Sequence, residues 1–228
     1  MHIEIVKDKL REDPDNVENI YKNIMTPISG YYLCDYYLCD EPQKWKMPEP
    51  NGLNLREHFS EILPYDILFI QSNYLQEFVS TYLPNIHVKI ILVTGQTHLP
   101  QLRISSTTNS LLEHECILAW FSQNPIYSHE KYFGLPYGIN NGVSHDNNPS
   151  YNNIRHYSRS LLRDNVDKTE NIIHLPMRVT HPCRNIFPTL RPISVEKYYE
   201  SIITSKYVLS PIGDREDCYR HWEAIGLG

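Results

Sequence analysis

The sequence predicts an α/β protein built on parallel sheets, and three observations lead to this fold class. Two apolar runs, Asp66–Ile70 and Val88–Val93, are nearly free of polar residues, which is typical of strands buried on both faces. The segment between them, Tyr74–Tyr82, repeats its apolar residues with helical spacing and ends before Pro84. Strand, helix and strand within about 30 residues predict a βαβ unit, whose two strands run parallel.

The same alternation continues to the end of the chain. A third strand is expected at Cys116–Trp120. In the second half, strands are expected at Asn171–Leu175 and Tyr207–Leu209, and helices at Val195–Thr204 and Cys218–Ile225. The sequence therefore predicts α/β structure in both halves.

A linker between two domains is predicted at Asn140–Asn153, which is poor in apolar residues and rich in Asn, Ser and Gly. We expect an α/β domain over residues 1–140 and a second over residues 141–228. About 80 residues remain after the linker, which is small for a Rossmann-like domain. The second domain is therefore expected to be reduced, or the chain to be truncated at its C-terminus.

Composition excludes several classes of protein. The chain has 228 residues, of which 41% are hydrophobic and 21% charged, as in ordinary folded proteins. The net charge of −6 disfavours a nucleic-acid partner. The longest apolar stretches are strand-sized, far from the roughly 20 residues of a membrane span. Five sparse cysteines favour a reducing compartment, so we expect a soluble, cytoplasmic protein.

Tyrosine is unusually frequent, with 17 Tyr against 6 Phe. Four of these residues lie in Tyr31–Asp40, a perfect duplication of the pentapeptide YYLCD. A tyrosine ring offers an apolar face and a hydroxyl, a combination that suits sugars. Tyr36 and Tyr37 are therefore candidates for binding a sugar acceptor, and a buried strand is the alternative interpretation.

The C-terminal segment carries a family resemblance. It combines a strand, the turn Ser210–Gly213 and a helix with Arg220, Glu223 and Ala224. This order resembles the nucleotide-sugar-binding segment of the exostosin-like glycosyltransferases. Looser similarities reach back to about residue 64: the Asp66–Ile70 strand, Leu92–Gly95, Trp120-Phe121 with Gln123-Asn124, Leu135-Pro136 with Gly138, and Thr180–Pro182 with Arg184.

The resemblance implies a GT-B architecture, in which two Rossmann-like domains with parallel sheets face a cleft. The acceptor side would be N-terminal and the nucleotide-sugar side C-terminal. It implies an inverting transfer to a hydroxyl of a glycan acceptor, with no cofactor and no obligatory metal. Without an anchor, the chain is similar to the small soluble members of large algal viruses, including xylosyltransferases that use UDP-xylose; a viral protein would act in the host cytoplasm.

Donor binding needs positive charge and hydrogen-bond donors at the leaving diphosphate. Arg220 lies in the first turn of the last predicted helix, and Arg184 lies in a proline-flanked loop, so both are candidates. Glu223 follows Arg220 on the same helix face and is a candidate for the ribose hydroxyls; a solvated Arg–Glu pair is the alternative. The remaining donor-binding candidates form the turn: Ser210, Pro211 and Gly213.

The acceptor hydroxyl needs a base. His98 lies in the loop after the second predicted strand, and histidine is a residue type suited to proton transfer near neutral pH. Gln96 and Thr97 of the same loop are candidates for acceptor contacts. Asp40 is the alternative candidate for the catalytic base, and Asp35 is a further alternative. The sequence therefore does not decide which of these residues is the catalytic base.

Two competing interpretations remain. Asp13–Asp15 has the DxD form of the metal-dependent GT-A glycosyltransferases, but its central proline predicts a turn in a charged stretch. A non-catalytic glycan-binding protein with a glycosyltransferase-like fold is the other alternative. Sequence fingerprints of dehydrogenases, P-loop enzymes and serine hydrolases do not occur in the chain.

Overall fold

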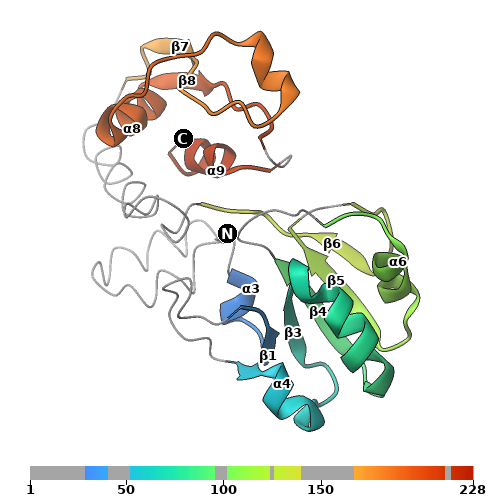
Figure 1. The fold of residues 1–228 in the computed structure, drawn as a ribbon. Helices are drawn as coiled ribbons and strands as arrows, with labels where there is room; N and C mark the ends of the chain where they lie inside the picture. Colours follow the sequence, from blue (N-terminus) through green and yellow to red (C-terminus); the bar gives the residue numbers. More distant parts are fainter. Residues whose placement is uncertain are drawn as a thin grey trace, which may run out of the picture. The chain divides into compact units, whose positions relative to one another are not determined.

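The computed structural model describes residues 29–40, 52–95, 102–123, 126–139, 167–213 and 217–227 (Figure 1). The chain divides into two compact units, Met1–Tyr137 and Gly138–Gly228, beside the expected boundary at residue 140. Each unit contains a parallel sheet and helices, which confirms the α/β fold class. The expected linker Asn140–Asn153 and the DxD segment Asp13–Asp15 lie outside the described residues.

The first unit is organised around a six-stranded sheet whose paired strands are all parallel. Its order is β2-β1-β3-β4-β5-β6. The strands are β1 (Tyr36–Leu38), β2 (Leu53–Asn54), β3 (Ile67–Gln71), β4 (Ile90–Gly95), β5 (Ile117–Ser122) and β6 (Tyr132–Gly134). The three strands expected from apolar runs are confirmed as β3, β4 and β5, and β2 and β6 are additions at the two edges of the sheet.

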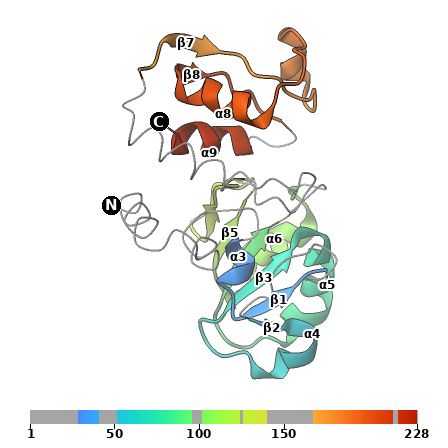
Figure 2. The ribbon, with the colours of Figure 1, turned by 90° about the vertical axis from the view of Figure 1, so that its left-hand side faces the viewer.

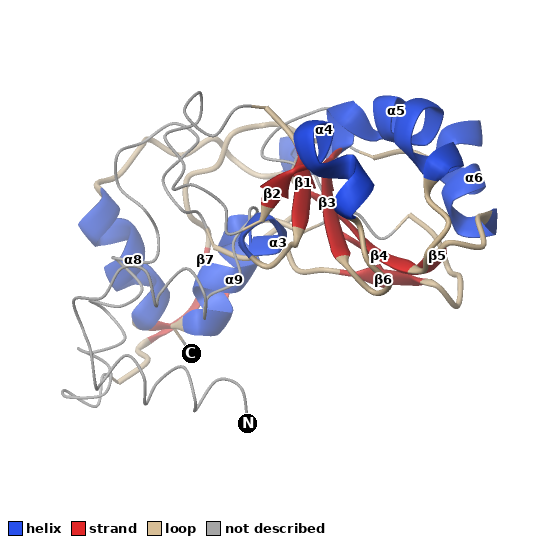
Figure 3. Ribbon diagram, turned by 90° about the horizontal axis from the view of Figure 1, so that it is seen from below, coloured by secondary structure: helices blue, strands red, loops and turns tan. Residues whose placement is uncertain are grey.

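Helices cover the two faces of this sheet unequally. Figure 3 shows α4 (Leu55–His58), α5 (Leu75–Glu77) and α6 (Ser106–Glu113) on one face and the short α3 (Ser29–Tyr32) on the other. Around α5, the chain continues as 3₁₀ and π turns from Ser72 to Asn85, so the expected helix is present with irregular hydrogen bonding.

Burial of both faces of the sheet explains why the sequences of the central strands are continuous apolar runs. Successive side chains of a strand point to opposite faces. On the α4–α6 face, Leu68, Ile70, Leu92 and Trp120 are fully buried, and on the α3 face Phe69 packs in a second, smaller cluster. Each fully buried large apolar side chain contributes roughly 1.5–3 kcal/mol, so both faces favour apolar residues at every position.

The duplicated pentapeptide folds in two different ways. In the first copy, Tyr31 belongs to α3 and Leu33 is 58% exposed. In the second copy, Tyr36–Leu38 forms β1, and Leu38 is completely buried. At the end of the first copy, Asp35 Oδ2 accepts a hydrogen bond from the backbone N–H of Ile67 at 2.8 Å. This contact fixes the start of the second copy beside β3.

Burial makes the two cysteines of the repeat poor nucleophiles. Cys34 and Cys39 are buried in the α3-side cluster, and burial raises the pKa of each thiol to about 12. At pH 8 we expect iodoacetamide to label the half-buried Cys183 and Cys218 of the native protein well before Cys34 and Cys39, because thiolate is the reactive form. Mass spectrometry of native and urea-unfolded samples measures this order; equal rates in the native sample would contradict it.

The second unit is smaller and has its own core (Figure 2). Its parallel strands are β7 (Glu170–Ile173) and β8 (Ser205–Val208), and its helices are α8 (Val195–Ile203) and α9 (Tyr219–Gly226). All four match expected elements to within a few residues. Their buried apolar residues are Leu175, Tyr199, Ile202, Ile203 and Leu227. Across the described ranges, no helix is long and apolar enough to cross a membrane.

Candidate functional site

The sheet of the first unit reverses its chain order between β1 and β3. From β1 the chain passes to β2 on one side, and from β3 it proceeds through β4 and β5 to β6 on the other. In open parallel sheets, ligands bind at the carboxyl ends of the strands at such a reversal. The residues that follow β1 and β3 therefore form the first candidate site.

Asp40 lies at this position. It follows β1, and its backbone N–H donates to Oε1 of Gln71, the last residue of β3, at 2.9 Å. The hydroxyl of Tyr74 donates to Asp40 Oδ1 at 2.5 Å. The hydrogen bond to Asp40, followed by burial, raises the pKa of Tyr74. Tyr74 therefore stays protonated, and its hydroxyl holds the Asp40 carboxylate from a neighbouring element of the chain.

Polar residues continue along the same edge of the sheet. Thr94 near the end of β4 is 1% exposed, and its Oγ1 accepts a hydrogen bond from Trp120 Nε1 at 2.8 Å. Ser72 Oγ donates to the carbonyl of Gly95 at 3.2 Å, which ties the ends of β3 and β4 together. Gln123, just beyond β5, is also buried. Buried polar groups are concentrated here because this edge borders the loops and not the core.

Among the acceptor-side candidates that the structure describes, Asp40 alone lies in this group. Tyr36 is the first residue of β1, so it lies at the amino end of the strand with its side chain in the core. Tyr37 packs with the α3-side cluster, where its ring centroid lies 5.3 Å from that of Tyr31. Asp35 also lies at the amino end. Gln96, Thr97 and His98 lie outside the described residues, so their roles stay predictions.

The second candidate site is the segment that carries the family resemblance. Strand β8 leads through the turn Ser210–Gly213 towards α9. The ring of His221 on α9 donates from Nε2 to the carbonyl oxygen of Ser210 at 2.7 Å, because a carbonyl oxygen only accepts. His221 Nδ1 then accepts from the backbone N–H of Cys218 at 3.3 Å. This imidazole joins the turn to the start of the helix.

Arg184 holds the same turn from the other side. Its Nε donates to the carbonyl of Ile212 at 2.8 Å and its Nη2 to that of Pro211 at 3.1 Å, while Nη1 donates to the carbonyl of Arg178 at 2.8 Å. A Cβ at Gly213 would lie 2.6 Å from Arg184 Nη2, so a larger residue at this position would require the guanidinium to shift. The guanidinium brings a positive charge to the turn, and it also has a structural role that spacing alone does not indicate.

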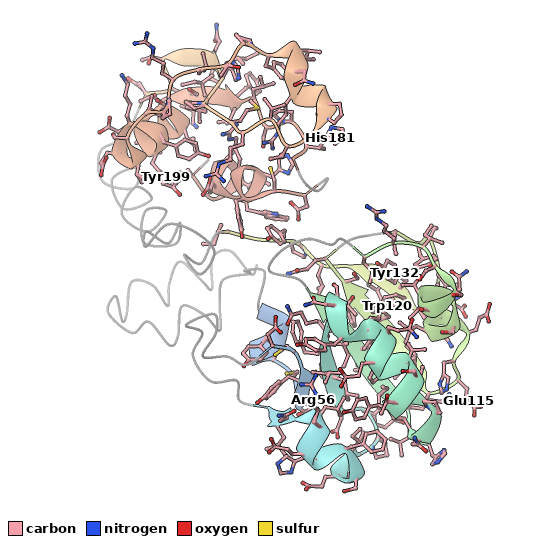
Figure 4. The ribbon with its side chains drawn as sticks, viewed as in Figure 1. Arg56, Glu115, Trp120, Tyr132, His181 and Tyr199 are labelled. Atoms are coloured by element: carbon pink, nitrogen blue, oxygen red, sulfur yellow. The ribbon has the colours of Figure 1, made fainter. Side chains whose placement is uncertain are left out.

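Glu223 is the most buried charged residue of this segment, with 6% of its surface exposed. The hydroxyls of Tyr198 and Tyr199 on α8 donate to its Oε2 and Oε1 at 2.8 and 2.9 Å; Tyr199 is labelled in Figure 4. Burial, followed by the charge of Glu223, raises the pKa of Tyr198, which therefore remains a donor. A buried carboxylate needs such donors, and nothing in the local sequence around Glu223 points to α8.

Arg220 is linked to this carboxylate through Tyr198. Its Nη2 donates to the carbonyl of Pro176 at 2.6 Å, and its Nε donates to the Tyr198 hydroxyl oxygen at 3.3 Å. The guanidinium also lies 5.7 Å from the centre of the Tyr198 ring. Arg220 and Glu223 therefore belong to one network, as their spacing on the helix predicts, but Tyr198 lies between them.

The described part of the chain contains no group of three or more His, Cys, Asp or Glu residues that could hold a metal. Comparisons with models of protein families and with curated proteins found no match for this chain.

Proposed function

We propose that the protein is an inverting glycosyltransferase that moves a sugar from a nucleotide sugar, UDP-linked, to a hydroxyl of a glycan acceptor. The observation that carries the proposal is the strand–turn–helix segment of the second unit, in which Arg184 and Arg220 bring two guanidinium groups to the turn and the following helix. Positive charge and backbone N–H groups at the start of a helix suit a diphosphate. The proposed architecture is of GT-B type, with one Rossmann-like domain for each substrate.

The proposed chemistry assigns one task to each unit. A base of the first unit, His98 or Asp40, removes the proton of the acceptor hydroxyl, and the oxygen attacks the anomeric carbon of the donor. Arg220, Arg184 and the start of α9 stabilise the negative charge that develops on the leaving diphosphate. The polar carboxyl edge of the first sheet supports the acceptor side, because ligands of parallel sheets bind at such edges.

Ligand binding and turnover test the proposal together. Thermal unfolding is measured with UDP, GDP, UDP-xylose and UDP-glucose; a ligand at 100 times its Kd stabilises by about 2.7 kcal/mol. Release of UDP is then measured with a panel of glycan acceptors. We expect saturating EDTA to leave the rate largely unchanged. Complete loss that Mn²⁺ restores would favour the metal-dependent GT-A alternative, and the absence of turnover with every donor would contradict the proposal.

A second candidate is a glycan-binding protein without catalysis. It is favoured by the internal contacts of the donor-side residues, since Arg184 donates to three backbone carbonyls and Glu223 accepts from two tyrosine hydroxyls. Binding of a glycan without stabilisation by any nucleotide sugar would support this second candidate.

A further inference from the structure

Four elements meet around Asp40 at the chain reversal of the six-stranded sheet. Asp40 itself follows β1, Gln71 ends β3, Tyr74 precedes α5, and Arg56 comes from α4. The Asp40 backbone is held by Gln71 and its carboxylate by Tyr74. A side chain that is held in one orientation by rigid elements, at the edge of the sheet where ligands bind, is typical of a functional residue.

Arg56 lies against the ring of Tyr74 and pairs with Glu77. Its guanidinium, labelled in Figure 4, lies 4.9 Å from the centre of the Tyr74 ring. Its Nε and Nη2 donate to the two carboxylate oxygens of Glu77, both at 3.2 Å, and Nη1 donates to the carbonyl of Cys39 at 3.5 Å. The positive charge of Arg56 is therefore paired with the carboxylate of Glu77.

We infer that Asp40 is the base that receives the proton of the acceptor hydroxyl, and that Tyr74 is the positioning residue that aims its carboxylate. The inference rests on the proposed glycosyl transfer and decides between its two candidate bases. Because Tyr74 Oη donates to Oδ1, it restricts rotation of the carboxyl group and directs Oδ2 in a fixed direction.

The transfer step balances with these groups. The acceptor O–H proton moves to the Asp40 carboxylate, and the acceptor oxygen forms a bond to the anomeric carbon of the nucleotide sugar. The bond between that carbon and the diphosphate oxygen breaks, and its electron pair leaves with the nucleoside diphosphate. Asp40 later returns the proton to water.

The test compares Asp40→Asn and Tyr74→Phe with the wild-type protein and with Tyr65→Phe. Tyr65 is a matched control, because it is 65% exposed and precedes the amino end of β3, at the opposite edge of the sheet. Circular dichroism and thermal unfolding establish that each variant is folded. Release of UDP is measured as a function of donor concentration, acceptor concentration and pH.

We expect Asp40→Asn to lower kcat by about 10²-fold or more, the usual contribution of a general base. Tyr74→Phe is expected to lower kcat about ten-fold and to leave the KM of the donor within about two-fold, because the donor site is in the other unit. Tyr65→Phe is expected to leave both kcat and the KM of the donor unchanged, because Tyr65 does not contact Asp40.

The outcomes separate this inference from the proposed function. A wild-type protein that turns over no nucleotide sugar overturns both. An active wild type whose Asp40→Asn variant keeps its rate overturns the inference alone and leaves His98 as the base. A Tyr74→Phe variant with an unchanged kcat removes the positioning role of Tyr74. If Asp40→Asn does not fold, the kcat of Tyr74→Phe at unchanged KM of the donor decides.

Discussion

Replacing Arg220 by alanine is expected to lower the rate of glycosyl transfer by about 10²-fold or more, because a cation that faces the leaving diphosphate stabilises charge mainly in the transition state. The guanidinium lies in the first turn of α9 and donates to Pro176 and Tyr198, so it is held in one orientation. A lysine at this position lacks the planar fork and should restore only part of the rate.

Arg191→Ala is the matched control for this prediction, since Arg191 is an exposed arginine of the same unit. Steady-state release of UDP is measured for both variants after circular dichroism has established that they are folded. A near-normal rate in Arg220→Ala would exclude the phosphate role and leave Arg220 as part of the α8–α9 network alone.

The second large effect is expected on stability, at Glu223. Glu223→Gln keeps the shape of the side chain and removes the charge that accepts hydrogen bonds from Tyr198 and Tyr199. Hydrogen bonds to a charged group each contribute about 1.5–3 kcal/mol. Since the amide can still accept one of them, we expect the second unit to lose about 2 kcal/mol.

Hydrogen exchange of the α8 and α9 peptides measures this loss in the second unit alone, which avoids treating a chain with two compact units as one cooperative transition. A loss of about 2 kcal/mol corresponds to roughly 30-fold faster exchange of the amides that open with the unit. Tyr199→Phe, which removes one donor, should give a smaller effect. Unchanged exchange in Glu223→Gln would show that the two hydroxyls do not stabilise this core.

Strands were the part of the fold that the sequence predicted best. Runs such as Ile67–Gln71 and Ile90–Gly95 are apolar on both faces, and this pattern depends only on burial in a parallel sheet. Several elements were missed: α3, α4, α6, β2 and β6. Helix α6 is capped by Ser105, whose Oγ accepts from the backbone N–H of Thr108 at 3.2 Å, a signal present in the sequence. Strand β6 has only three residues, too few for a periodic pattern.

The candidate sites were predicted less completely, because their contacts join distant residues. Arg220 and Glu223 were identified as candidates from the family resemblance, together with their spacing on one helix. Their partner Tyr198 is 22 and 25 positions away in the chain, on α8. Tyr74 is 34 positions from Asp40 and reaches it only because β1 and β3 are neighbours in the sheet. No local pattern indicates such pairs.

The pentapeptide repeat shows most clearly which features depend on the sequence alone and which depend on the tertiary structure. Composition and apolar runs by themselves determined the parallel α/β class, since they report which segments must be buried on both faces. They did not determine the structure of the two identical copies, of which one enters α3 and the other forms β1. Only the tertiary structure decided this, because the second copy pairs with β3 and places Leu38 in the core, while the first copy leaves Leu33 exposed. The burial gained by packing exceeds the small differences in local propensity.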